Sequence, residues 1–130
     1  MTYVRENKVI LYIYKKCSTC QNALRFLEEN LPNHRIEIKE INLTPPTIEE
    51  LKSMLNYQDG NIRKLFNTSG ILYKELQLKD KLHDLRLEEA LKLLNQNGML
   101  VKRPFLLGDA FGLIGFKESE WQKNLTVVKR

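Results

Sequence analysis

The chain has 130 residues, of which 21 are Lys or Arg and 16 are Asp or Glu, giving a formal net charge of +5 at pH 7. This length favours one domain, and 42% hydrophobic with 28% charged residues is a globular rather than a disordered composition. The longest apolar run, residues 9–14, is far shorter than the ~20 residues of a membrane-spanning helix. The polar leader, residues 1–7, is expected to be frayed and has no signal-peptide pattern. We therefore expect a cytoplasmic protein without a membrane partner.

The start of the chain predicts a strand, a helix and a second strand. Residues 9–14 are β-branched and aromatic without polar alternation, as in a strand buried on both faces. Over residues 20–31 the apolar positions recur every three or four residues and predict an amphipathic helix. Residues 35–43 alternate between apolar and charged until the phase slips at Glu40, where we expect a bulge or the strand's end. Because a helix joins the two strands, they should be parallel.

Residues 47–97 predict a helical block inserted after the second strand. Thr47 and Glu50 form a capping box at the start of its first helix. Shorter helices are expected over residues 61–66 and 71–78, followed by a longer amphipathic one.

The last helix of the block and the elements after it are predicted from their boundary residues. Asp84 is expected to cap that helix and Gly98 to end it. Two apolar runs, residues 105–107 and 111–116, flank a Gly-Asp-Ala turn and predict a β-hairpin. Residues 117–125 predict a final helix.

Cys17 and Cys20 form a C-x-x-C motif at the junction of the first strand and the first helix. Unpaired N–H groups and the positive end of the helix dipole favour a thiolate at Cys17, and Lys15 and Lys16 add positive charge nearby. Cys20 lies one turn later on the apolar stripe and should be less solvated. This asymmetry suits an attacking and a resolving thiol, as in a thioredoxin-like redox site.

Two other interpretations of the cysteine pair remain open. Free cysteines also pack as small hydrophobic residues inside a protein. A zinc site usually needs a second pair of ligands, and only His34 and His83 remain in the sequence. We interpret both histidines as ordinary surface or cap residues and predict no metal site.

Arg103 and Pro104 stand directly before the first strand of the predicted hairpin. A proline there removes a backbone donor, for which a cis peptide in a tight turn is one reason. Taken by themselves, the two residues indicate only an ordinary trans turn and a solvated charge.

In combination, these features resemble the arsenate reductase (ArsC)/Spx family of thioredoxin-like proteins over roughly residues 8–121. Several motifs carry the resemblance: Tyr14-Lys15-Lys16-Cys17-Ser18-Thr19-Cys20, Asn61-Ile62-Arg63-Lys64-Leu65-Phe66 with Tyr73 and Leu76, Lys102-Arg103-Pro104-Phe105-Leu106, and Gly115-Phe116.

The resemblance implies an α/β, thioredoxin-like fold with a mixed four-stranded sheet and a helical insertion between strands 2 and 3. It makes residues 1–130 one domain, with a core at 8–46 and 98–125 and the insertion at 47–97. It also implies that Pro104 is cis and lies near Cys17.

The resemblance further implies that Arg103 binds an oxyanion or stabilises the thiolate, which suits a guanidinium group. The family's arsenate reductases use a single cysteine and three arginines. Here Arg103 matches one arginine, Arg63 lies one turn before the position of the second, and the third falls near residues 116–117. These departures argue against arsenate reduction and favour the C-x-x-C-bearing, Spx-like branch.

Our first hypothesis is therefore a thiol–disulfide oxidoreductase acting on a small oxyanion or a disulfide, with Cys17, Cys20, Arg103, Pro104, Lys16 and Arg63 as site residues. It would need no bound cofactor, because thioredoxin or glutaredoxin with glutathione would restore the dithiol. The alternative is a redox switch of the Spx type that binds the α-subunit of RNA polymerase. Direct nucleic-acid binding is not expected, because the basic residues do not cluster on one predicted helix.

Overall fold

The computed structural model describes residues 8–32 and 35–125. Its centre is a mixed four-stranded sheet built from β1 (Val9–Ile13), β2 (Ile36–Glu40), β3 (Phe105–Leu107) and β4 (Gly112–Ile114). The strands lie in the order β2-β1-β3-β4. β1 and β2 are parallel, and β3 is antiparallel to both β1 and β4. The predicted parallel pair and hairpin are both confirmed, and β2 ends at Glu40, where the hydrophobic phase slips.

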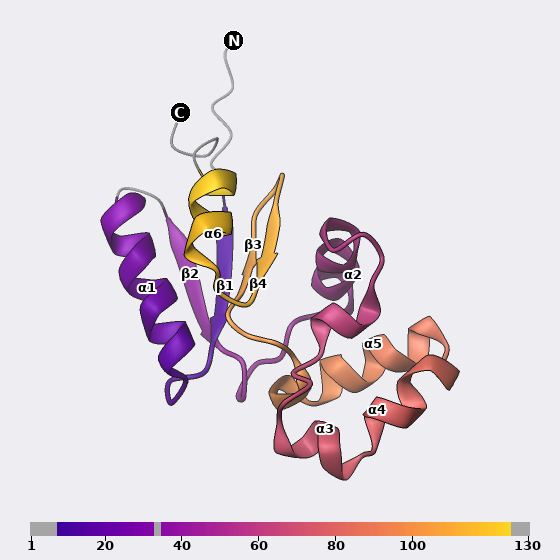
Figure 1. Cartoon of the computed structure of the whole chain (residues 1–130). Helices are drawn as coiled ribbons and strands as arrows, with labels where there is room; N and C mark the ends of the chain where they lie inside the picture. The colour runs from indigo at the N-terminus through magenta and orange to yellow at the C-terminus, as the bar shows by residue number, and fades with distance from the viewer. Residues whose placement is uncertain (1–7, 33–34, 126–130) are drawn as a thin grey trace.

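Two helices, α1 (Ser18–Asn30) and α6 (Glu118–Leu125), cover one face of the sheet (Figure 1). β1 is apolar throughout because both of its faces are covered, this one by α1 and α6 and the other by the helical block. Trp121 on α6 is fully buried, and its Nε1–H donates to the Gly115 carbonyl at 3.0 Å. This hydrogen bond ties α6 to the residue that follows β4. The buried core on this face consists of Val9, Leu11, Ile13, Cys20, Ala23, Phe26, Leu27, Leu31, Leu106, Leu113, Trp121 and Leu125.

The helical block lies toward the other face and the lower end of the sheet (Figure 1). Its first helix begins with the predicted capping box: the Thr47 hydroxyl accepts from the Glu50 N–H at 3.1 Å, and the Glu50 carboxylate accepts from the Thr47 N–H at 2.9 Å. Its elements are α2 (Ile48–Tyr57), η1 (Ile62–Leu65), α3 (Ile71–Glu75), α4 (Leu78–Lys81), η2 (Leu82–Asp84), α5 (Leu87–Gln96) and η3 (Gly98–Leu100), where η denotes a 3₁₀ helix.

Hydrogen bonds join this block to the sheet at several places. The Gln58 amide donates to the Gly112 carbonyl of β4 at 3.1 Å, and the Tyr12 hydroxyl of β1 donates to Glu50 at 2.6 Å. The Lys102 N–H donates to the Leu65 carbonyl at 2.9 Å. The residues beside them, Phe66 and Val101, form an isolated antiparallel β-bridge. The segment that leads into β3 is thereby attached to η1.

Two details of the block differ from the sequence predictions. Asp84 does not cap a helix: it ends η2, while α5 starts at Leu87 and the Glu89 carboxylate accepts the Arg86 N–H at 3.0 Å. The prediction for Asp84 is therefore wrong: the N-cap residue is Arg86, whose N–H bonds to Glu89 in the first turn of α5, so the helix starts two residues later than a cap at Asp84 would require. The helix predicted over residues 71–78 is split into α3 and α4 by Gln77, which has a φ of 56°.

The sequence also predicts a frayed leader, histidines on the surface and no membrane-spanning helix. Residues 1–7 and His34 lie outside the described residues. His83 is exposed, as predicted, with its Nε2 3.4 Å from Asp84. Of the helices in the described ranges, none is long and apolar enough to cross a membrane.

Candidate active site

Cys17 is the N-cap residue of α1, directly after the turn that ends β1. Its backbone is extended, with φ −96° and ψ 115°, and its Sγ accepts a hydrogen bond from the Cys20 N–H at 3.4 Å. The Cys17 N–H closes the preceding turn by donating to the Tyr14 carbonyl at 3.0 Å. The sulfur therefore meets the unpaired N–H groups and the positive end of the helix dipole.

These surroundings favour the thiolate of Cys17. Partial burial opposes its ionisation, but hydrogen bonds from Cys20 and Thr19 and the positive charge of Arg103 outweigh that effect, so the pKa of Cys17 is lowered. The side chain is only half-buried, so a reagent can reach it. A partly exposed thiol with a lowered pKa is the usual form of a reactive cysteine.

Cys20 lies in the opposite environment. Its side chain is fully buried against the sheet. Burial, together with a smaller contribution from the adjacent Cys17, raises the pKa of Cys20 to about 12. Both residues are free thiols. The pair thus contains one thiol prepared to attack and a second, protonated thiol one helical turn away.

Arg103 approaches the pair from the segment before β3. Its guanidinium lies over the Tyr14 ring, 5.1 Å from the centroid, and its Nη1 donates to the carbonyls of Met99 and Val101 at 3.3 and 3.4 Å. Among the described residues, no acceptor lies within hydrogen-bonding distance of its buried Nε. The Arg103–Pro104 peptide bond is cis, as the resemblance implies. Arg103 is thus a fixed positive charge beside the thiols with one donor still unpaired.

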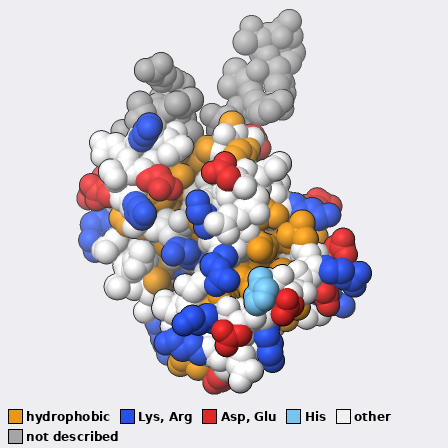
Figure 2. All heavy atoms as spheres, turned by 45° about the vertical axis from the view of Figure 1, so that its right-hand side comes forward, with side chains coloured by type: hydrophobic (Ala, Val, Ile, Leu, Met, Phe, Trp, Pro, Cys, Tyr) orange, Lys and Arg blue, Asp and Glu red, His pale blue; other side chains and the backbone are white. Residues whose placement is uncertain are grey.

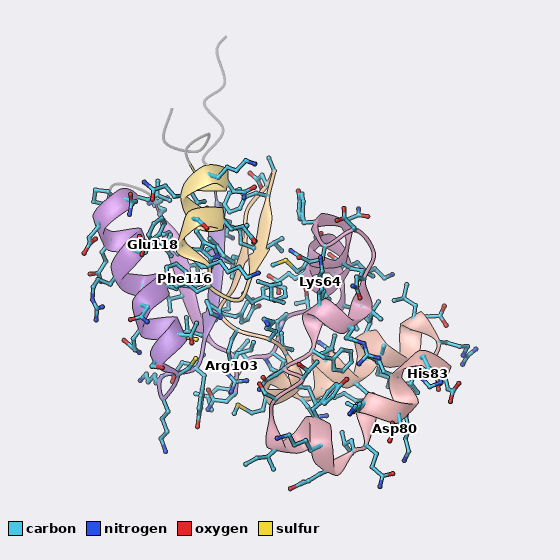
Figure 3. All side chains as sticks on the ribbon, viewed as in Figure 1. Lys64, Asp80, His83, Arg103, Phe116 and Glu118 are labelled. Carbon is cyan, nitrogen blue, oxygen red and sulfur yellow. The ribbon has the colours of Figure 1, made fainter. Side chains whose placement is uncertain are left out.

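Cys17 opens onto a cleft of about 650 Å³ between the sheet and the helical block. Positive side chains outnumber carboxylates in its lining, where Glu120 is the one acidic residue among those described, so the cleft suits an anionic ligand. Figure 2 shows Lys and Arg side chains running across the middle of this face. In Figure 3, Arg103 and Lys64 mark the two sides of the cleft. Its cationic residues are Arg63, Lys64, Lys102, Arg103 and Lys117.

The structure places the other predicted site residues at different distances from this cleft. Arg63 lines it and donates from Nη1 to the buried Tyr73 hydroxyl at 3.0 Å, which orients the guanidinium. Pro104 is buried and does not line the cleft. Lys16 is exposed on the turn before α1 and is also absent from the lining. Cys17, Arg63 and Arg103 are therefore brought together, whereas Lys16 is not.

Three cleft lysines were not predicted from the sequence. Lys64 and Lys102 each stand beside a predicted arginine, and Lys117 lies at the place where the resemblance puts a third arginine. The third arginine that the resemblance implies near residues 116–117 was the one sequence signal that could have indicated a cationic cleft residue. Among residues 8–32 and 35–125, no group of three His, Cys, Asp or Glu side chains is arranged to hold a metal ion.

Known proteins are similar to this chain over most of its length. YusI of Bacillus subtilis, described only as uncharacterized, is 43% identical over 115 residues, which span 87% of this chain and 94% of YusI. The global transcriptional regulator Spx of Enterococcus faecalis is 30% identical over 117 residues, spanning 88% of this chain and 84% of Spx. A crystal structure of an ArsC family related protein from Bacteroides fragilis matches with a TM-score of 0.82 at 43% identity, covering 92% of this chain and 98% of that one.

The family model of the ArsC family matches residues 12–124, which include every element of the site. Together with the structural match, this confirms the predicted thioredoxin-like α/β fold with its mixed sheet. The chain therefore belongs to the ArsC family.

Proposed function

We propose that this protein is a cytoplasmic thiol–disulfide oxidoreductase that acts on anionic substrates. One observation carries the proposal: a thiol with a lowered pKa opens onto a cationic cleft, and a second, buried thiol lies one helical turn behind it. A structural pair of buried cysteines would need neither the exposure of Cys17 nor the charge of Arg103.

In the first step the Cys17 thiolate attacks one sulfur of a substrate disulfide. The substrate S–S bond breaks, a mixed disulfide forms between Cys17 and one half of the substrate, and the other half leaves as a thiolate. Arg63 and Arg103 attract the anionic groups of the substrate toward the sulfur.

In the second step Cys20 attacks the Sγ of Cys17. An internal disulfide forms and the bound half leaves as a thiolate, which takes up the proton that Cys20 gives up. The dithiol has then transferred two electrons to the substrate. Once Cys17 is in the mixed disulfide its negative charge is gone, so one cause of the raised pKa of Cys20 disappears while the charge of Arg103 remains. Cys20 thus becomes more acidic at the moment when it must react.

An external thiol system must reduce the internal disulfide before the next turnover. Thioredoxin, or glutaredoxin with glutathione, has the required chemistry. A small oxyanion is the alternative anionic substrate, because the same cationic groups would hold it against Cys17.

The test is an assay of the wild type, Cys17→Ser and Cys20→Ser with an anionic aromatic disulfide and with arsenate. Each is measured with thioredoxin or with glutathione and glutaredoxin as the reductant. We expect disulfide turnover by the wild type and a loss of about a hundredfold or more in Cys17→Ser. Cys20→Ser should still form the mixed disulfide and keep partial turnover with glutathione, because glutathione can resolve it.

Two results would contradict the proposal. Turnover retained in Cys17→Ser would exclude Cys17 as the nucleophile. Absence of turnover in the wild type with every substrate and reductant would exclude an enzymatic role.

The second candidate function is a redox switch in transcription. The observation that favours it is the similarity to Spx regulators at 29–30% identity over most of the chain. In that case oxidation of the cysteine pair would alter a surface that binds the α-subunit of RNA polymerase. Capture of the purified α-subunit by the reduced but not by the oxidised protein, or the reverse, would support the switch, and equal or absent capture would oppose it.

A further inference from the structure

The outer edge of β2 is open in the described part of the chain. β2 is the edge strand of the sheet and, within residues 8–32 and 35–125, pairs only with β1. The Ile41 N–H donates to the Ile13 carbonyl at 2.8 Å, and backbone groups alternate in direction along a strand. The backbone groups of Ile36 and Ile38 therefore point away from β1. An edge of this kind can pair with another strand.

An apolar groove lies beside this edge, between α1 and β2. Its volume is about 350 Å³, and Glu28 is the one charged residue among those described in its lining. The side chain of Ile38 is 51% exposed, which is unusual for a β-branched residue in a strand. A contiguous apolar surface next to an open strand indicates an interface more strongly than a single exposed residue would. The apolar lining consists of Leu24, Leu27, Leu31, Pro32, Ile36 and Ile38.

The charges of β2 are complementary to themselves in one register. If two copies of β2 pair antiparallel about Ile38, Glu37 of each copy lies opposite Lys39 of the other, on the same face of the sheet. Any other register that keeps paired side chains on the same face of the sheet moves the centre of the pairing from Ile38 to a neighbouring residue. It then places Glu37 opposite Glu37, or Lys39 opposite Lys39, and like charges directly opposite each other are destabilising.

We propose that the occupant of this edge is a second copy of the chain, paired antiparallel along β2 about Ile38. The two sheets then form one continuous eight-stranded sheet, and the outward backbone groups of Ile36 and Ile38 bond to the partner strand. The Ile38 side chains of the two copies lie opposite each other and shield the groove. Lys39 is held for this pairing by the Tyr12 ring, 5.8 Å from its Nζ.

This interface leaves the cleft open. The cleft lining contains no residue of β2 and, from α1, only Thr19 beside the N-cap Cys17. The dimer is therefore independent of the proposed redox function, and either one can fail without the other.

The test is sedimentation velocity of the full chain, in the presence of a reductant, up to about 1 mM. We expect a dimer whose fraction rises with concentration. Glu37→Lys and Lys39→Glu should each weaken it by about tenfold or more, because each opposes like charges twice across the two-fold axis. The double variant E37K/K39E should restore the dimer, and a mixture of the two single variants should form a heterodimer. Lys52→Glu, on the exposed surface of α2, is the matched charge reversal that should leave the dimer unchanged.

Two results would overturn the proposal. A wild type that stays monomeric over the whole concentration range would exclude the interface. Single variants that dimerise as strongly as the wild type would place the contact on another face. Circular dichroism and the Cys17 alkylation rate establish that each variant is folded, so a folding defect is not mistaken for lost association.

Discussion

The two sides of the cleft are built in different ways. On the core side, Cys17 is placed by backbone geometry: a strand ends, a helix begins, and main-chain N–H groups surround the sulfur. On the other side, the helical block contributes Arg63 and Lys64 from a short 3₁₀ helix, and their position depends on side-chain contacts such as the bond to Tyr73. We infer that the core determines how reactive the thiol is and that the helical block determines which substrates are attracted to it.

The largest expected effect is on stability, from a substitution at the junction between the helical block and the core. Gly98 begins η3, where the block returns to the core, and a Cβ there would overlap the backbone carbonyl oxygen of Ile41. We expect Gly98→Ala to lower the free energy of unfolding by about 3 kcal/mol, the upper end of the usual cost of overpacking. Gly60 has open space around it and a φ of +76°, so Gly60→Ala should cost only about 1 kcal/mol. Urea denaturation measures both, and equal losses would show that the junction is not tightly packed.

The next prediction separates the two arginines of the cleft. Arg103→Gln removes a charge that lowers the pKa of Cys17, so less thiolate is present at pH 7 and alkylation should slow several-fold. Arg63 is not among the groups that shift this pKa, so Arg63→Gln should leave alkylation by a neutral reagent unchanged.

For turnover, Arg63→Gln should instead raise the KM for an anionic disulfide, and the effect should shrink at high salt because exposed charges are screened. Iodoacetamide kinetics and steady-state assays at two ionic strengths supply both readouts. If the two variants slow alkylation equally, the division of roles between core and block is wrong.

The smallest effect is expected from the residue that orients Arg63. Tyr73→Phe keeps the ring contact with Phe66 but removes the hydroxyl that accepts the Arg63 hydrogen bond. We expect the KM for an anionic disulfide to rise about two- to fivefold, the cost of one hydrogen bond at a partly exposed group. Tyr57→Phe removes a hydroxyl bonded to the Asp109 carbonyl, outside the cleft, and should leave KM unchanged. A change of similar size in both variants would point to a general loss of packing.

The regular part of the fold could be predicted from the sequence, because its signals are local. Hydrophobic periodicity and a connecting helix were enough to predict the parallel pairing of β1 and β2, and the phase slip at Glu40 marked the strand's end. The helical block was harder to predict, because its short segments are held by tertiary contacts. Gln77 interrupts a predicted helix with a positive φ that no local preference demands, and Arg86 rather than Asp84 is the N-cap residue of α5.

The same contrast applies to the site. The different surroundings of Cys17 and Cys20 could be predicted because the strand–helix junction determines them. Lys64, Lys102 and Lys117 could not, because they come from separate segments that only the folded chain brings to one cleft. Lys16 shows the converse: it adjoins Cys17 in sequence, yet the positive charge that lowers the pKa of Cys17 comes from Arg103, far along the chain.

The most direct test of the central claim is the pH dependence of alkylation at each cysteine, followed by mass spectrometry. The fold stabilises the thiolate of Cys17, so its rate should reach half of its maximum below the ~8.5 of an ordinary thiol. Cys20, whose pKa is raised to about 12, should stay unmodified over this range in the folded protein. Rates that rise together for both residues around pH 8.5 would contradict the account.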